Sequence, residues 1–287
     1  MKKWIAVLLA AVFMLTIVGC GGTTDAGNSP DAGNSPDTDG FRSFTAVDNK
    51  YCSIKVTGYD PDNIFGYTVN LELENKTLTK TLYFTTDRCT VNGLEWTPWL
   101  YKTVEPGKTI STEMNFTGEE YARLIREYTD IELTFIVQNT DDANDNVACE
   151  RVHIYPQGEN NAKKDAYVPQ ETETVLADNE QFTMIMRRVE PYGDSAQLIR
   201  LYLENKTDLR LMFSAQDMTV NGVSYDPFWA KSVYAGDGAL SEIIFDMNEL
   251  GQSGVADLED IEFVLLVYEY DSLADLYSQQ ITIHLLH

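Results

Sequence analysis

The residues of this chain best suited to contact a ligand are aromatic. Six large rings surround two prolines, Pro98 and Pro227, in separate parts of the sequence: Trp96, Trp99, Tyr101, Tyr225, Phe228 and Trp229. Exposed rings could stack on a sugar or hold a peptide, whereas buried rings would fill a core, where aromatic side chains contribute much of the packing energy. Because the rings recur at matching places, 96 with 225 and 99 with 228, packing is the favoured interpretation. Exposure of one ring at each place would make this the best binding site in the chain.

A run of acidic and amide residues offers oxygen ligands of the kind that Ca²⁺ prefers. Its members are Asp141, Asp142, Asn144 and Asp145. The run lacks the EF-hand register and its distal Glu, and Asp and Asn are ordinary turn formers, so a solvated turn is favoured over a weak calcium site. The three His are scattered and the Cys form no tight cluster. We therefore expect neither a metal nor another cofactor.

Catalytic groups are equally hard to recognise. Adjacent carboxylates occur at Glu119-Glu120, Asp141-Asp142 and Glu259-Asp260, but adjacency carries little information in a chain with 45 acidic residues. Cys52, Cys89 and Cys149 have no base at a diagnostic spacing. Cys52 and Cys89 correspond to Phe182 and Met218 in the repeat described below, which indicates small buried apolar side chains, with a disulfide as the alternative. The sequence predicts that the protein is not an enzyme.

Charge excludes one class of partner. The 287 residues contain 21 Lys and Arg against 45 Asp and Glu, a net charge of −24, and basic residues beyond the N-terminus cluster only in doublets. Nucleic-acid binding needs clustered cations, so we expect no nucleic-acid partner. Residues 44–157 carry −8 and residues 158–287 carry −15. A charged partner is therefore expected to be cationic.

The N-terminus predicts where in the cell the protein is located. Met1-Lys2-Lys3 precedes an apolar stretch, Trp4 to Val18, which is too short for a comfortable membrane span and is followed by Gly and polar residues. Its end, Ile17-Val18-Gly19-Cys20, resembles the bacterial lipobox, which implies cleavage after a 1–19 signal peptide and lipidation of Cys20. Acyl chains there would provide the only membrane attachment, on the extracytoplasmic face of the cell membrane.

Residues 20–43 predict a flexible tether after the lipidated cysteine. The hexapeptide Asp25-Ala-Gly-Asn-Ser-Pro30 repeats unchanged at 31–36, and the segment has almost no apolar side chains with which to form a core.

The remainder of the chain is an internal duplication. Residues 71–77 return at 201–207, each ending Leu-Glu-Asn-Lys-Thr, and Thr90-Val-Asn-Gly93 returns as Thr219-Val-Asn-Gly222. Matches continue at Lys102, Gly107 and Phe116, which meet Lys231, Gly236 and Phe245. Agreement this widely spread indicates two copies of one module. Asn75 and Asn205 head Asn-x-Thr triplets, which we expect to end strands rather than to accept a glycan.

Within each copy the apolar residues alternate with polar ones, as at Cys52, Ile54 and Val56, or Ile261, Phe263 and Leu265. This period predicts half-buried antiparallel strands, and Asn-Gly at 92–93 and 221–222 predicts hairpins. Thr117-Gly-Glu-Glu120 and Asp246-Met-Asn-Glu249 both fit the capping box, so we expect one short helix in each copy.

These patterns predict an all-β protein of two tandem immunoglobulin-like β-sandwich domains, each with one short helix. The expected boundaries are 44–157 for the first domain and 176–287 for the second, with an exposed linker at 158–175. The lipobox, the tether and modules with the L-x-L-x-N-K-T strand end, the V-N-G hairpin and Pro106-Gly107-Lys108 resemble small Ig-like modules of surface lipoproteins from low-GC Gram-positive bacteria. The second copy departs from this pattern with Ala235 and Asp237. The resemblance implies fold and location, and no catalytic residues.

The preferred hypothesis is a non-catalytic binding or adhesion module for a protein, glycan or wall polymer. One alternative is a structural or accessory subunit of a membrane-associated complex, which predicts a smooth apolar strip shared by both copies. The other is a hydrolase with an unrecognised carboxylate pair.

Overall fold

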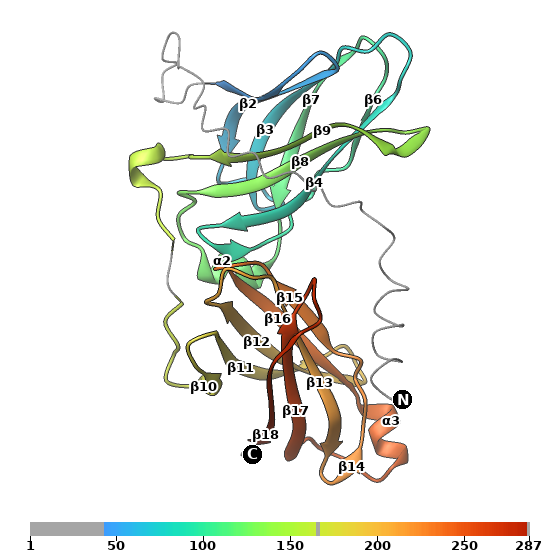
Figure 1. The fold of residues 1–287 in the computed structure, drawn as a ribbon. Helices are drawn as coiled ribbons and strands as arrows, with labels where there is room; N and C mark the ends of the chain where they lie inside the picture. The colour runs from blue at the N-terminus through green and yellow to red at the C-terminus, as the bar shows by residue number, and fades with distance from the viewer. Residues whose placement is uncertain (1–42, 165–166, 286–287) are drawn as a thin grey trace. The chain divides into compact units, whose positions relative to one another are not determined.

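The computed structural model describes residues 43–164 and 167–285, and almost all of its secondary structure is antiparallel β-strand (Figure 1). Over these ranges it adds two short α-helices, α2 (Glu119–Leu124) and α3 (Met247–Gln252), and one 3-10 turn, η1 (Glu159–Asn161). The all-β prediction is confirmed. The signal peptide, Cys20 and all but the last residue of the tether lie outside the described residues. No helix in the described ranges is long and apolar enough to cross a membrane.

Contacts divide the chain into two compact units. Among the described residues, the first contains 43–87, 98–117 and 134–152, and the second contains 88–97, 118–133, 153–164 and 167–285. Three stretches of the first sequence repeat, 88–97, 118–133 and 153–157, thus belong to the second unit.

The first unit contains a four-stranded antiparallel sheet. Its order is β1 (Phe44–Asp48), β2 (Cys52–Asp60), β3 (Tyr67–Asn75) and β7 (Thr109–Phe116). A further set of strands follows the order β4 (Leu82–Val91), β8 (Ile131–Asn139) and β9 (Asp142–Ile154), with β6 (Lys102–Val104) paired to β4.

The second unit repeats this plan. One sheet has the order β10 (Thr174–Asp178), β11 (Phe182–Tyr192), β12 (Ala196–Asn205), β16 (Gly238–Asp246) and β5 (Leu94–Glu95), and β5 pairs in parallel with β16. The other has the order β14 (Val223–Ser224), β13 (Leu211–Val220), β17 (Asp260–Glu269) and β18 (Asp275–His284), with β15 (Ala230–Val233) paired to β13. Side chains from both sheets share one apolar core, which includes Phe182, Phe213, Phe245 and Phe263.

The predicted alternation is visible as burial. Cys52, Ile54 and Val56 are buried on β2, and the intervening residues are not. On β11 the alternation breaks, because the register with β12 shifts between Met186 and Arg188. The bulge places Arg188 on the same face as Arg187, away from the apolar core. Arg187 is buried on that face by Tyr167, Glu173 and Glu120, to which it donates hydrogen bonds.

Two buried asparagines end equivalent strands in the same way, as the Asn-x-Thr triplets predict. The side-chain nitrogen of Asn75 donates to the carbonyls of Lys80 and Val104, at 2.8 Å each. Asn205 donates to Leu209, Val233 and Tyr234 at 2.7–3.0 Å. The side-chain oxygens accept from the amide and hydroxyl groups of the following Thr, two residues on. Each Asn therefore satisfies several backbone groups that no strand pairs.

The two predicted Asn-Gly hairpins are also pinned identically. Asn92 donates to the Glu127 carbonyl and accepts from the amides of Thr129 and Asp130. Asn221 donates to Asp257 and accepts from Glu259 and Asp260. Both Asn have positive φ, 51° and 50°, which this residue tolerates better than most. The duplication thus extends to individual hydrogen bonds.

The helices confirm one predicted cap and correct the other. Asp246 caps α3 by accepting from the amides of Asn248 and Glu249. The N-cap of α2 is Gly118, which has no side chain to accept a bond, so the capping box predicted at 117–120 is wrong. The Glu120 carboxylate instead binds arginines of β11.

Candidate functional site

The six predicted aromatics divide into buried and exposed rings. Trp96, Tyr225 and Trp229 are buried. Trp99 is 65% exposed, Tyr101 48% and Phe228 78%. The matching places therefore share their environment, since 96 and 225 are both internal and 99 and 228 both face solvent. Packing is the correct interpretation for the first pair only.

The buried rings are held by specific contacts. Trp96 stacks on Tyr121 of α2, with ring centroids 4.6 Å apart. Tyr225 packs on Phe245 and its hydroxyl accepts from the Asp246 amide at 2.9 Å. The indole nitrogen of Trp229 donates to the Ser241 hydroxyl at 3.0 Å.

Trp99 lies between two buried neighbours in the first unit. Pro98 and Leu100 on either side of it are buried, and its amide donates to the Asn115 carbonyl at 2.7 Å. Its ring meets Tyr101 edge-to-face, with centroids 5.2 Å apart and an interplanar angle of 79°. Two exposed rings in fixed contact form an apolar surface suited to stacking.

Phe228 is presented in the second unit by a strained turn. Its φ is 51°, in the left-handed region that bulky residues rarely adopt, and its amide donates to the Asp226 carboxylate at 2.9 Å. A left-handed Phe whose ring is mostly in solvent gains little packing in return for this strain. Such outliers concentrate at functional sites.

Other exposed apolar side chains do not match between the repeats. The first has Ile64, Phe65 and Leu78, and the second has Val175, Tyr192, Leu209, Ile244 and Leu273. Residues 99 and 228 are the matched pair among the large exposed hydrophobics of the described chain.

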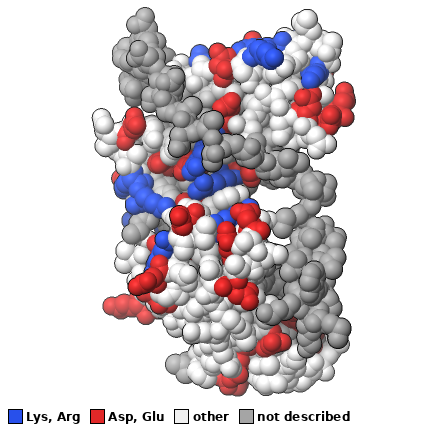
Figure 2. Space-filling view, in the orientation of Figure 1, with Lys and Arg blue, Asp and Glu red and all other residues white. Residues whose placement is uncertain are grey.

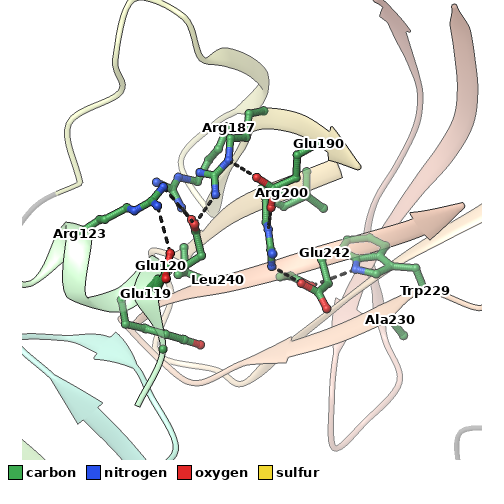
Figure 3. A pocket seen from close by; sticks show the side chains of 15 residues that line it. Glu119, Glu120, Arg123, Arg187, Glu190, Arg200, Trp229, Ala230, Leu240 and Glu242 are labelled. Carbon is green, nitrogen blue, oxygen red and sulfur yellow. Dashed lines mark hydrogen bonds and ion pairs between the residues drawn. The ribbon is translucent and has the colours of Figure 1, made fainter. Parts of the chain in front are cut away.

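A second feature, a cleft of about 720 Å³ in the second unit, has a charged lining (Figure 3). Its wall includes α2, β11, β12 and β16. Acidic and basic groups alternate along a ladder of ion pairs in the order Glu173, Arg187, Glu120, Arg188, Glu190, Arg200 and Glu242.

Arg187 anchors one end of the ladder. Its side chain is 6% exposed, and it donates to Glu120 at 2.9 Å, to Glu173 at 3.2 Å and to the Tyr167 hydroxyl at 2.8 Å. Tyr167 in turn stacks on Tyr202, with centroids 3.9 Å apart. The expected linker is therefore fixed here, although the next residue, Val168, is exposed.

The middle of the ladder is held by bidentate carboxylates. Glu120 accepts from Arg187 through one oxygen and from Arg188 through the other. Glu190 accepts from Arg188 and Arg200 at 2.7 Å each. Arg200 also binds Glu242.

The arginines keep these carboxylates ionised. Burial alone would raise the pKa of Glu120, but hydrogen bonds and charge from Arg188 and Arg187 outweigh it and hold the pKa below its usual value. Hydrogen bonds from Arg188 and Arg200 lower the pKa of Glu190. A general acid needs a raised pKa, so these groups are suited to rigid charge pairing rather than to proton transfer.

Sequence reasoning noticed Arg187 and Arg188 only as a basic doublet. A signal was present, because the doublet directly follows Phe182, Met184 and Met186, whose alternation predicts a half-buried strand. The bulge and the partners from α2 could not be read from the spacing.

The acidic run offers no assembled calcium site. Asp145 pairs with Lys80 at 2.5 Å and accepts from Asn139, and these bonds lower its pKa. The side chains of Asn139 and Asp142 accept from nearby amides, as in ordinary turns. Across residues 43–164 and 167–285, no three His, Cys, Asp or Glu side chains are grouped closely enough to hold a metal ion.

Cys52 and Cys89 are buried free thiols. Neither forms the disulfide that the sequence allowed as an alternative. Burial raises the pKa of Cys52 to about 11 and also raises that of Cys89. Neither thiol is activated as a nucleophile.

Acidic side chains are scattered over the face seen in Figure 2, with uncharged surface between them. This view gives no sign of a single concentrated acidic patch.

Comparisons with known proteins assign no family. No protein-family model and no curated protein sequence matches the chain. Among solved structures, red sea bream transglutaminase aligns over 82% of this chain and 31% of its own, with 12% identity and a TM-score of 0.23. An oxalate decarboxylase aligns over 89% and 81%, with 10% identity and a TM-score of 0.11. The chain spans about a third of the transglutaminase, and scores this low support no conclusion about fold or function.

Proposed function

We propose that this protein is a lipid-anchored, extracytoplasmic binding protein that is not an enzyme and that uses one exposed aromatic contact in each of two immunoglobulin-like modules. The observation that carries the proposal is the matched exposure of Trp99 and Phe228 at equivalent places of the duplication. The strained backbone of Phe228 and the fixed Trp99–Tyr101 pair support it.

The proposed ligand is a glycan or cell-wall polymer. Flat apolar rings suit stacking on the apolar faces of sugars, and a polymer offers repeated sites to two linked contacts. Two linked weak contacts raise the effective affinity, because the second binding event becomes intramolecular. The lipid on Cys20 would supply attachment to the membrane, and a charged ligand would be cationic.

The test compares retention of the full chain on purified cell-wall polymer with that of Trp99→Ala, Phe228→Ala and the double variant. A single aromatic contact contributes about 0.5–1.5 kcal/mol, so each single variant should bind about 2- to 12-fold more weakly. The double variant should lose more than the product of the single losses, because avidity is also lost. Phe65→Ala and Tyr192→Ala are matched controls, since both rings are exposed and neither belongs to the matched pair.

Tryptophan fluorescence gives a direct readout, because Trp96 and Trp229 are buried and Trp99 is the exposed indole of the described chain. Polymer binding should change the Trp99 emission. A double variant that binds like the wild type would refute the proposal, and retention on protein fractions alone would replace the glycan with a protein ligand.

A further inference from the structure

Equivalent hairpins and sheet edges of the two repeats differ in whether they are paired with each other. In the second unit, β5 pairs in parallel with β16, and the Gly238 amide donates to the Gly93 carbonyl at 2.9 Å. The equivalent of β5 in the second repeat is β14, and the equivalent of β16 in the first is β7. Both β14 and β7 are terminal strands of their sheets in the described chain, and the outer edge of β7 is bridged by Trp99 only at Asn115, five residues beyond Ile110. One hairpin is thus seated on an edge, and a second hairpin and a second edge of the same design have no strand beside them.

The seated hairpin is fixed by charge. Arg88, just before the hairpin, donates to Asp237, just before β16, at 2.7 Å, and Asp237 is buried. Glu95 of β5 accepts from the Tyr234 amide at 2.7 Å and pairs with Lys231 at 3.2 Å. Charge and backbone pairing therefore act on the same few residues.

The unseated elements carry the same charge pair with its signs exchanged. The repeat places Asp217 where Arg88 stands, and Lys108 where Asp237 stands. Asp217 and Lys108 are both exposed, and neither takes part in an ion pair among the described residues. Ser224 corresponds to Glu95, and its hydroxyl oxygen can likewise accept a hydrogen bond from a backbone amide.

The exchange also discriminates between the edges. Asp217 placed against Asp237, or Arg88 against Lys108, would bring like charges together in a partly buried contact, which opposes binding. The β4–β5 hairpin therefore suits β16, and the β13–β14 hairpin suits β7.

We propose that the β13–β14 hairpin of one molecule binds the free edge of β7 in a second copy of this chain, with Asp217 paired to Lys108. The contact would place Val223–Ser224 alongside Thr109-Ile110 in the parallel register that β5 and β16 use. Because the two surfaces differ, the contact is heterologous and leads to a head-to-tail chain or a closed ring. This proposal uses neither Trp99 nor Phe228 and is independent of the proposed ligand.

The test is sedimentation of the purified full chain at low salt and at concentrations up to about 1 mM, where small interfaces associate. The wild type should form dimers and larger species that decrease with added salt. Lys108→Asp and Asp217→Lys should each raise the dissociation constant at least tenfold. Thermal unfolding should be unchanged in Lys108→Asp, because this side chain is exposed. It should fall slightly in Asp217→Lys, because Asp217 is exposed but has a φ of 49°, which Asp tolerates better than Lys.

An equimolar mixture of the two variants is the decisive arm. Each mixed contact joins either two unchanged faces or two exchanged faces, so opposite charges meet again and assembly should return. The double variant alone should also assemble. Lys50→Asp, at another exposed lysine of the first unit, is the matched control and should assemble like the wild type. A wild type that stays monomeric throughout, or a mixture that does not recover, would overturn the proposal.

Discussion

The same row of positions crosses the equivalent sheets of the two repeats, with different residues in each. In the first unit the row is Gly58, Asn70 and Glu113, on β2, β3 and β7. In the second unit it is Arg188, Arg200 and Glu242, on β11, β12 and β16.

The backbone pairing of this row is unchanged, and so are the asparagines that pin strand ends and hairpins. What differs is the chemistry of the face. Buried polar groups must keep their partners, because an unsatisfied group costs more than its bond contributes, whereas an exposed face can change freely. The duplication therefore preserved the framework and gave the second copy a ladder of ion pairs.

The largest expected effect on the difference between the two faces comes from Arg187→Ala, which removes a member of the ion-pair ladder. Loss of this buried guanidinium leaves Glu173 and Glu120 without one of their partners, so the free energy of unfolding should fall by about 3–5 kcal/mol. Its equivalent at the bulge of β2 is the exposed Thr57, and Thr57→Ala should cost less than about 1 kcal/mol. Urea unfolding of both variants measures the contrast. Equal losses at the two sites would contradict the role assigned to the ladder.

The shared framework predicts the opposite result at the strand ends. Asn75→Ala and Asn205→Ala each leave buried backbone carbonyls and amides without their hydrogen-bond partners. Each substitution should lower the free energy of unfolding by about 2–4 kcal/mol. Agreement between the two losses within about 1 kcal/mol would sharpen the comparison. A loss in one repeat only would show that the equivalent hydrogen bonds stabilise the two repeats to different extents.

Acid should weaken the ladder. The folded-state pKa values of Glu120 and Glu190 lie below their ordinary value of 4.5, so the ionised ladder adds stability above that pH. This contribution should be lost as the pH falls through the lowered values. Thermal unfolding between pH 7 and pH 3 should show a smaller decline for Glu190→Gln than for the wild type. Parallel curves for the two proteins would count against the prediction.

The smallest effect expected concerns backbone strain. Phe228→Gly removes the left-handed penalty and should raise the free energy of unfolding by about 0.5–1 kcal/mol. Trp99 has an ordinary φ, so Trp99→Gly should lower it by a similar amount. Chemical denaturation of the two variants provides the measurement, and a destabilised Phe228→Gly would argue that the ring packs more than its exposure indicates.

The strand framework was largely predictable from sequence because period-two alternation reports burial directly, as on β2 and β17. The Asn-Gly hairpins and the α3 cap were predictable because their signals are local. The α2 cap failed because a local motif cannot reveal that distant arginines compete for Glu120. Exposure of Trp99 and Phe228 also depends on tertiary packing, so spacing could locate these rings without choosing between core and surface.

The asparagine pins also bear on how the chain folds. Asn92 reaches residues 35–38 positions further on, and Asn221 reaches residues 36–39 further on. Each hairpin turn can form early, but it is locked only after the intervening strands and helix have been made. Contacts of this separation form only after the chain has lost the conformational entropy of closing a long loop. This loss slows folding and prolongs the exposure of strand edges. Until residues near Asp130 or Asp260 arrive, each hairpin therefore remains free to slip or to pair with the wrong edge.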